Sequence, residues 1–207
     1  MEQAYGPIAN EDQVREYERR RYRGLDQRVV DYLEWRCISR LLDRVVVRGS
    51  TVVDVPCGYG RFTLRLAARG ALVFGVDISD RMVARTRERW RPGVPGAAAD
   101  VTTLPFANDS VEGAVVMRLL HHLEDSERQR ALNEIARVIS EWAVLSAYTV
   151  APLHRLVRRV QGRPPKEAAM SLLRKQIESA GLEILETRAL LPYLHAQHMF
   201  LVRPGPD

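Results

Sequence analysis

Cysteine is scarce in this sequence, and long apolar runs are absent from it. Cys37 and Cys57 alone do not make a disulfide framework, so a reducing compartment is the simplest expectation. The apolar runs extend over only a few residues, whereas a membrane-spanning helix needs ~20. Residues 1–20 contain no apolar segment of the kind that a secretory signal requires. These absences predict a cytoplasmic protein that does not span a membrane.

Lysine is also rare. Lys166 and Lys175 are the only two lysines, and arginine supplies the rest of the positive charge. The formal net charge is +5. A GC-rich genome gives the same preference for arginine. The alternative explanation is an anionic partner, whether phosphate, carboxylate, nucleic acid or acidic membrane. The length of 207 residues and the apolar share of 46% predict one globular domain with a sizeable core.

Short β-branched runs alternate regularly with helical patterns along the chain. Strands are predicted over residues 51–55, 71–77, 97–100, 111–117, 141–147, 182–189 and 197–203. Helices are predicted over residues 11–22, 25–45, 60–69, 80–90, 126–139 and 167–180, with a capping box at 126–129. The alternation predicts a doubly wound α/β fold with a mostly parallel sheet. The last two strands are joined too closely for a crossover, so they should form an antiparallel C-terminal hairpin.

A turn that contains two glycines follows the first predicted strand, in the stretch Asp54-Val55-Pro56-Cys57-Gly58-Tyr59-Gly60. Ligands of open α/β sheets bind outside the carboxyl ends of the strands. Glycine lets the backbone approach such a ligand closely, and the next helix directs free N–H groups to the same place. The dinucleotide fingerprint requires a third glycine where this chain has Thr63. By itself, this stretch fits both a cofactor-binding turn and a purely structural one.

Acidic residues end the next two predicted strands. Asp77 lies about twenty residues past the glycine turn, where a carboxylate can accept hydrogen bonds from both hydroxyls of a ribose. An alternative role for Asp77 is to cap the following helix, although Ser79 or Asp80 can also do this. Asp100, followed by Val101, ends the third predicted strand.

In this order and spacing, the motifs resemble the class I S-adenosylmethionine-dependent methyltransferases. The sequence is most similar to their small-molecule branch, which includes the quinone and lipid C-methyltransferases. The resemblance covers about residues 50–203. It implies a Rossmann-like seven-stranded sheet with one antiparallel strand and S-adenosyl-L-methionine as the cofactor. It also implies an N-terminal helical lid or cap over residues 1–48 and a cofactor-binding domain over residues 49–207.

The same resemblance implies where the cofactor would be held. The turn would surround the methionine end, Asp77 the ribose, and Asp100 the adenine amino group. Pro56 replaces the family's usual first glycine, so we expect a stiffer strand end with one donor fewer. The residues expected around the cofactor are Tyr17, Arg23, Asp54, Pro56, Cys57, Gly58, Gly60, Asp77, Ile78, Asp100, Val101, Met117 and Arg118.

Methyl transfer from a sulfonium is an in-line displacement, for which the protein must mainly align the acceptor and exclude water. His121 and His122 follow the fourth predicted strand and are the candidates for a general base, with support of the loop as their alternative role. Tyr148, Tyr193 and His195 are the candidate substrate residues. No metal is expected, because no convincing ligand spacing is present.

Residues 152–160 alternate cationic and apolar side chains. This pattern fits peripheral contact with an acidic membrane, a grip on an anionic substrate, or a solvated helix near the site. The expected function is methyl transfer to a small or lipid-like acceptor, with an anionic acceptor as one option. An RNA methyltransferase, a noncatalytic cofactor-binding or regulatory subunit, and a nicotinamide-dependent enzyme are the alternatives. Nucleic acid is disfavoured because no RNA-binding module is evident, and the oligomeric state is not predicted.

Overall fold

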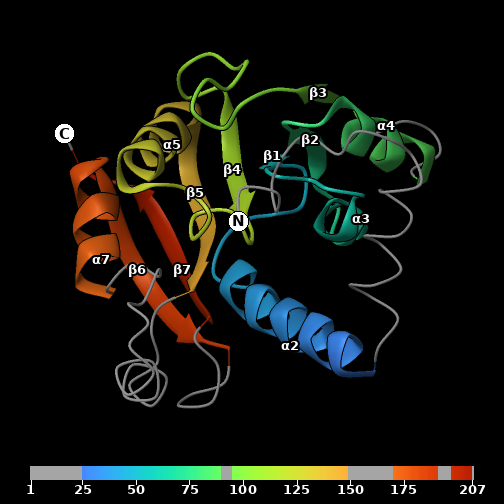
Figure 1. Ribbon diagram of the computed structural model, residues 1–207, viewed down its shortest axis with the longest axis horizontal. Helices are drawn as coiled ribbons and strands as arrows, with labels where there is room; N and C mark the ends of the chain where they lie inside the picture. Colours follow the sequence, from blue (N-terminus) through green and yellow to red (C-terminus); the bar gives the residue numbers. More distant parts are fainter. Residues whose placement is uncertain (1–24, 90–94, 149–169, 191–196, 207) are drawn as a thin grey trace, which may run out of the picture.

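The computed structural model describes residues 25–89, 95–148, 170–190 and 197–206 (Figure 1). The strands are β1 Thr51–Asp54, β2 Leu72–Asp77, β3 Gly96–Ala98, β4 Val111–Val116, β5 Ile139–Tyr148, β6 Leu182–Ala189 and β7 Gln197–Pro204. The helices are α2 Leu25–Leu42, α3 Arg61–Ala68, α4 Asp80–Arg89, α5 Asp125–Val138 and α7 Met170–Ser179. The predicted helix at 11–22 and the basic segment at 152–160 lie outside the described residues.

All the strands belong to one seven-stranded sheet with the order β3-β2-β1-β4-β5-β7-β6. In Figure 1 this order runs from β3 at the upper right to β6 at the lower left. β7 is antiparallel to β5 and to β6, while the remaining neighbours are parallel. The predicted fold, with one antiparallel strand in a C-terminal hairpin, is therefore confirmed. The strand order reverses between β1 and β4, where ligands of such sheets bind.

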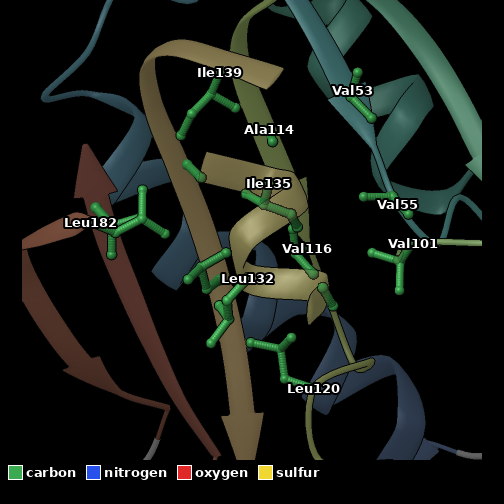
Figure 2. Close-up of a cluster of buried hydrophobic side chains, with 14 of the residues drawn as sticks. Val53, Val55, Val101, Ala114, Val116, Leu120, Leu132, Ile135, Ile139 and Leu182 are labelled. Carbon is green, nitrogen blue, oxygen red and sulfur yellow. The ribbon is translucent and has the colours of Figure 1, made fainter. Parts of the chain in front are cut away.

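The sheet has an apolar cluster on each face, because successive strand residues point to opposite sides. On one face, Leu132 and Ile135 of α5 pack with Ala114 and Val116 of β4 (Figure 2). Helix α7 joins the same cluster through Leu173 and Ile177. These contacts place α5 and α7 together on one face of the sheet.

On the opposite face, helices α2 and α3 pack side by side against the sheet. The buried residues of α2 there are Cys37, Ile38, Leu41 and Leu42, and those of α3 are Phe62 and Leu66. The described part of the predicted N-terminal cap is thus built into the domain's core, and its action as a lid stays a prediction. Among the described helices, none combines the length and the apolarity that crossing a membrane requires.

Several element boundaries differ from the prediction. α2 ends at Leu42 instead of residue 45, and β3 ends at Ala98, two residues before Asp100. The capping box of α5 joins Glu124 and Glu127 instead of starting at Ser126, because the helix begins two residues earlier with the same three-residue spacing. β5 begins at Ile139, directly after α5, instead of at residue 141. Ile139 is buried and pairs with Val111 of β4, so an apolar residue at the helix end extends the strand.

Candidate active site

The glycine turn between β1 and α3 adopts a backbone that favours glycine. Gly58 and Gly60 have φ angles of 54° and 79°, in the left-handed region. A Cβ atom on Gly60 would lie 3.0 Å from Cγ2 of Thr86 in α4. The Thr86 hydroxyl donates a hydrogen bond of 2.8 Å to the carbonyl oxygen of Gly58. A residue of α4 therefore stabilises the turn. Helix α3 begins directly after the turn, with its first N–H groups facing the same edge of the sheet.

Asp77, the last residue of β2, is bonded directly to this turn. Its Oδ2 accepts a 3.0 Å hydrogen bond from the backbone N–H of Gly58, and its Oδ1 accepts one of 3.0 Å from Ser79 N–H. Burial raises the pKa of Asp77, although the two N–H donors act to lower it. The neighbouring side chain of Ile78 is 70% exposed. At the end of β2, the buried carboxyl group of Asp77 and the exposed apolar side chain of Ile78 therefore lie next to each other beside the glycine turn.

Asp100 lies two residues beyond the end of β3 and is exposed. Its Oδ1 accepts hydrogen bonds of 2.8 and 2.9 Å from the N–H and the hydroxyl of Thr102. The N–H of Ala99 donates to the carbonyl oxygen of Asp77 at 2.9 Å, which keeps this segment beside the end of β2. Val101 is buried in the apolar core. The Asp100 carboxylate is thus presented at the same edge of the sheet as Asp77.

Asp54 and Cys57 lie buried beneath the turn. Oδ2 of Asp54 accepts a 2.5 Å hydrogen bond from the Thr63 hydroxyl, whereas its Oδ1 has no partner among the described residues. Burial raises the pKa of Asp54 to about 7. Burial and the nearby carboxylates of Asp54 and Asp77 raise the pKa of the Cys57 thiol. A thiol of this kind packs rather than attacks, because the thiolate is the nucleophile. Pro56 lies half-buried in the same turn.

Arg118 follows β4 and its buried neighbour Met117, and its backbone is unusual. Its φ angle is 57°, in the left-handed region that few large residues adopt. Its N–H donates to the hydroxyl of Ser146 in β5 at 2.7 Å. Its guanidinium group makes two hydrogen bonds to Glu34 of α2, at 2.7 and 2.8 Å. The end of β4 is therefore fixed by a strand on one side and by a helix on the other.

Glu34 is a site residue that the sequence reasoning missed. Its side chain is 0% exposed and also accepts hydrogen bonds from Arg61 (2.7 Å) and Gln197 (2.8 Å). A signal was present, because Glu34 lies three residues before Cys37 and four before Ile38, on the buried stripe of α2. A carboxylate on an apolar stripe needs partners.

Three of the aromatic candidates come together at the carboxyl ends of β4 and β5. The ring of His121 lies 3.8 Å from that of His122 and 4.3 Å from that of Tyr148, measured between centroids. His122 is exposed, and the other two are half-buried. The remaining candidates, Tyr17, Arg23, Tyr193 and His195, lie outside the described residues.

These features define a class of protein. The strand order, the antiparallel β7, the glycine turn after β1 and the acidic end of β2 are those of the Rossmann-like fold of class I methyltransferases. Residues 52–141 match the family described as methyltransferase domain. The predicted family is therefore confirmed. Among the described residues, no cluster of three or more histidine, cysteine or acidic side chains has the geometry to hold a metal ion.

Two similar proteins are methyltransferases. Trans-aconitate 2-methyltransferase of Methylobacterium nodulans is 36% identical over 146 residues, which are 66% of this chain and 54% of that protein. Demethylmenaquinone methyltransferase of Corynebacterium kroppenstedtii is 38% identical over 91 residues, 44% of this chain and 38% of that protein. The chain thus spans about half, or less, of the length of these relatives.

A solved structure shares the fold at low sequence identity. Magnesium protoporphyrin IX methyltransferase from Synechocystis, with S-adenosylhomocysteine bound, superposes with a TM-score of 0.73 and 20% identity. The match covers 92% of this chain and 93% of that chain. This likeness supports the fold across nearly the whole chain.

Proposed function

We propose that this chain is a methyltransferase that uses S-adenosylmethionine to methylate a small organic molecule. The observation that carries the proposal is the hydrogen bond between Asp77 and the N–H of Gly58, which joins the acidic end of β2 to the glycine turn. The matched family is a methyltransferase domain, and magnesium protoporphyrin IX methyltransferase, which shares the fold, has S-adenosylhomocysteine bound. Both findings support S-adenosylmethionine as the cofactor. When bound, the cofactor supplies a methyl group on a sulfonium, which is an electrophile.

The described residues fit this cofactor by their chemistry. The lone pairs of Asp77 suit the hydroxyls of a ribose, and the exposed side chain of Ile78 suits the flat face of adenine. Two glycines leave the backbone of the turn open to close approach. Oδ1 of Asp54, which no described residue bonds, lies fully buried beneath the same turn, so we assign Asp54 support of the turn. Asp100 offers an exposed carboxylate for an amino group. Val101 and Met117 are buried, so we assign them support of the site rather than side-chain contact.

For the acceptor, we propose a site over the ends of β4 and β5. The rings of His121, His122 and Tyr148 present polarisable faces and polar edges there, which suit a flat organic ring. One relative is a demethylmenaquinone methyltransferase and another is a trans-aconitate 2-methyltransferase. Both a quinone-like ring and a carboxylic acid are therefore candidate methyl acceptors. His122 is the more exposed histidine, so we propose it as the base for an acceptor that must lose a proton.

Calorimetry with S-adenosylmethionine and S-adenosylhomocysteine tests the cofactor. We expect Asp77→Ala to weaken the binding of S-adenosylhomocysteine by roughly one to two decades, since hydrogen bonds to a charged group contribute ~1.5–3 kcal/mol. Asp80→Asn is the matched control, because Asp80 is an exposed carboxylate in the first turn of α4. Equal affinity in both variants would remove Asp77 from the site, and absence of binding in the wild type would remove the function.

A panel of acceptors tests the substrate class. Purified protein is incubated with tritiated S-adenosylmethionine and, separately, a demethylmenaquinone analogue, trans-aconitate or transfer RNA. We expect incorporation of label into a small molecule and none into RNA. We also expect His122→Gln to slow this turnover while it leaves S-adenosylhomocysteine affinity unchanged. Label in RNA, with binding that falls steeply as salt increases, would favour the RNA alternative.

A further inference from the structure

Glu34 is the most completely bonded carboxylate of the described helix α2. Its Oε1 accepts hydrogen bonds from Nε of Arg118 (2.7 Å) and Nε2 of Gln197 (2.8 Å). Its Oε2 accepts from Nη2 of Arg61 (2.7 Å) and Nη2 of Arg118 (2.8 Å). Burial acts to raise the pKa of Glu34, but the two arginines and Gln197 outweigh it and lower the pKa. The group is therefore a charged carboxylate with both oxygens occupied.

The three donors come from separate parts of the proposed site. Arg61 is the first residue of α3, directly after Gly60 of the turn. Arg118 follows β4, and Gln197 begins β7, where it pairs with Tyr148 of β5. A single side chain of α2 thus joins the glycine turn, the end of β4 and the strand beside the proposed acceptor site. Burying such a charge is costly, and helix docking alone does not require it, because α2 also packs through apolar residues.

The backbone of Arg118 needs such a support. A large residue in the left-handed region is strained and persists only where its surroundings hold it. Here the Ser146 hydroxyl holds the N–H, and Glu34 holds the guanidinium group with two parallel hydrogen bonds. The residues that follow Arg118 lead directly to His121 and His122.

We propose that Glu34 is a positioning residue that fixes Arg118 in its left-handed conformation at the cofactor edge, and so places the histidine pair for methyl transfer. The inference rests on the proposed function for its catalytic part only. Glu34 acts through Arg118 and does not touch the cofactor or the acceptor.

The test compares Glu34→Gln with Asp31→Asn in the full chain. Glutamine keeps the size of Glu34 but replaces one acceptor oxygen by an NH₂ group, so the paired hydrogen bonds to Arg118 are lost. Asp31 lies one turn earlier on α2 and pairs with Arg61 (3.0 Å) and Arg65 (3.1 Å) of α3. Asp31→Asn therefore weakens the contact between α2 and α3 while Glu34 keeps its hydrogen bonds to Arg118.

The first measurement is hydrogen exchange of the Arg118 amide by NMR. We expect exchange to be about 10-fold faster in Glu34→Gln than in Asp31→Asn, after correction for global stability, because the local structure that protects this amide opens. The second measurement uses any acceptor that the wild type methylates. We expect kcat to fall by about 10- to 100-fold in Glu34→Gln, with the KM for S-adenosylmethionine within about threefold, because misplacement of aligned groups slows chemistry. Asp31→Asn should keep the wild-type kcat.

Several results would overturn the proposal. Equal exchange of the Arg118 amide in the two variants would reduce Glu34 to a docking contact, and so would unchanged kcat in Glu34→Gln. If Glu34→Gln does not fold, Glu34→Asp, which keeps the charge but is one methylene shorter, is measured in the same way and decides the question. If the wild type binds neither S-adenosylmethionine nor S-adenosylhomocysteine, the proposed function fails. The exchange data then still decide whether Glu34 fixes Arg118.

Discussion

Asp54 lies fully buried beneath the glycine turn, and burial raises its pKa from an ordinary 3.8 to about 7. Between pH 3.8 and about 7, the native state therefore keeps a proton on Asp54 that the unfolded chain has already released. Stability from this group is present at low pH and is lost as the pH rises toward 7. We predict that, between pH 5 and 8, the wild type loses about 3 kcal/mol of unfolding free energy relative to Asp54→Asn.

Urea unfolding at intervals over this pH range measures the difference. Subtracting the Asp54→Asn curve removes the contributions of other titrating groups, such as Asp77, whose pKa burial also raises. Asparagine keeps an acceptor for the Thr63 hydroxyl, so the variant should fold. Two parallel curves would contradict a raised pKa for Asp54.

Residue patterns predicted some parts of the site and missed others for a physical reason. Asp77 was found because a carboxylate at a strand end, about twenty residues past a glycine turn, follows from local spacing. Glu34 was missed because its partners Arg118 and Gln197 lie far along the chain, 84 and 163 residues away. Such contacts are created by the packing of α2 against the sheet. Local spacing marks Glu34 as a carboxylate on an apolar stripe, but it does not reveal the partners.

At the scale of elements, the turn between β1 and α3 depends on a left-handed glycine. We predict that Gly60→Ala lowers stability by about 1–2 kcal/mol, which is the cost of that conformation for a residue with a Cβ. Close approach to Thr86 at 3.0 Å adds to this cost. We also predict roughly 10-fold weaker binding of S-adenosylhomocysteine, a loss of about 1.4 kcal/mol.

Gly181→Ala is the matched control, measured by urea unfolding and calorimetry alongside Gly60→Ala. Gly181 has a φ of 77° between α7 and β6, and a Cβ there would meet no atom within 4 Å. Gly181→Ala should lose stability only through its left-handed backbone conformation, and it should keep the wild-type affinity for S-adenosylhomocysteine. If Gly181→Ala weakened the affinity as much as Gly60→Ala does, the loss would be a general effect of stability and not of the turn.

The elements themselves were largely predictable. Strands such as β1 and β4 are short β-branched runs bounded by breakers, and the close spacing of β6 and β7 dictates an antiparallel hairpin. The ends of elements were less predictable. β5 starts at Ile139, because this residue both ends α5, through its N–H bond to the carbonyl oxygen of Ile135, and pairs with Val111 of β4. Val29, an apolar residue of α2, is 56% exposed, because the sheet meets a face of this helix that includes Glu34 instead.

At the scale of the whole molecule, a ligand that binds the native state alone raises its thermal stability. At a concentration of 100 Kd, the gain is ~2.7 kcal/mol. For a chain of this size, each kcal/mol corresponds to ~2–4 °C, so S-adenosylhomocysteine should raise the Tm by about 5–10 °C. Differential scanning fluorimetry measures this shift, with NAD at the same concentration as the comparison. A shift with NAD and none with S-adenosylhomocysteine would favour the nicotinamide alternative.

The sequence by itself determined the class of fold, the position of the glycine turn and the acidic strand ends, because these depend on periodicity and turn chemistry within short stretches. Only the tertiary structure decided which helix face meets the sheet, and with it the joining of Glu34 to Arg61, Arg118 and Gln197. Burying a carboxylate requires partners with exact placement, and that placement exists only once α2, α3, β4 and β7 have packed together.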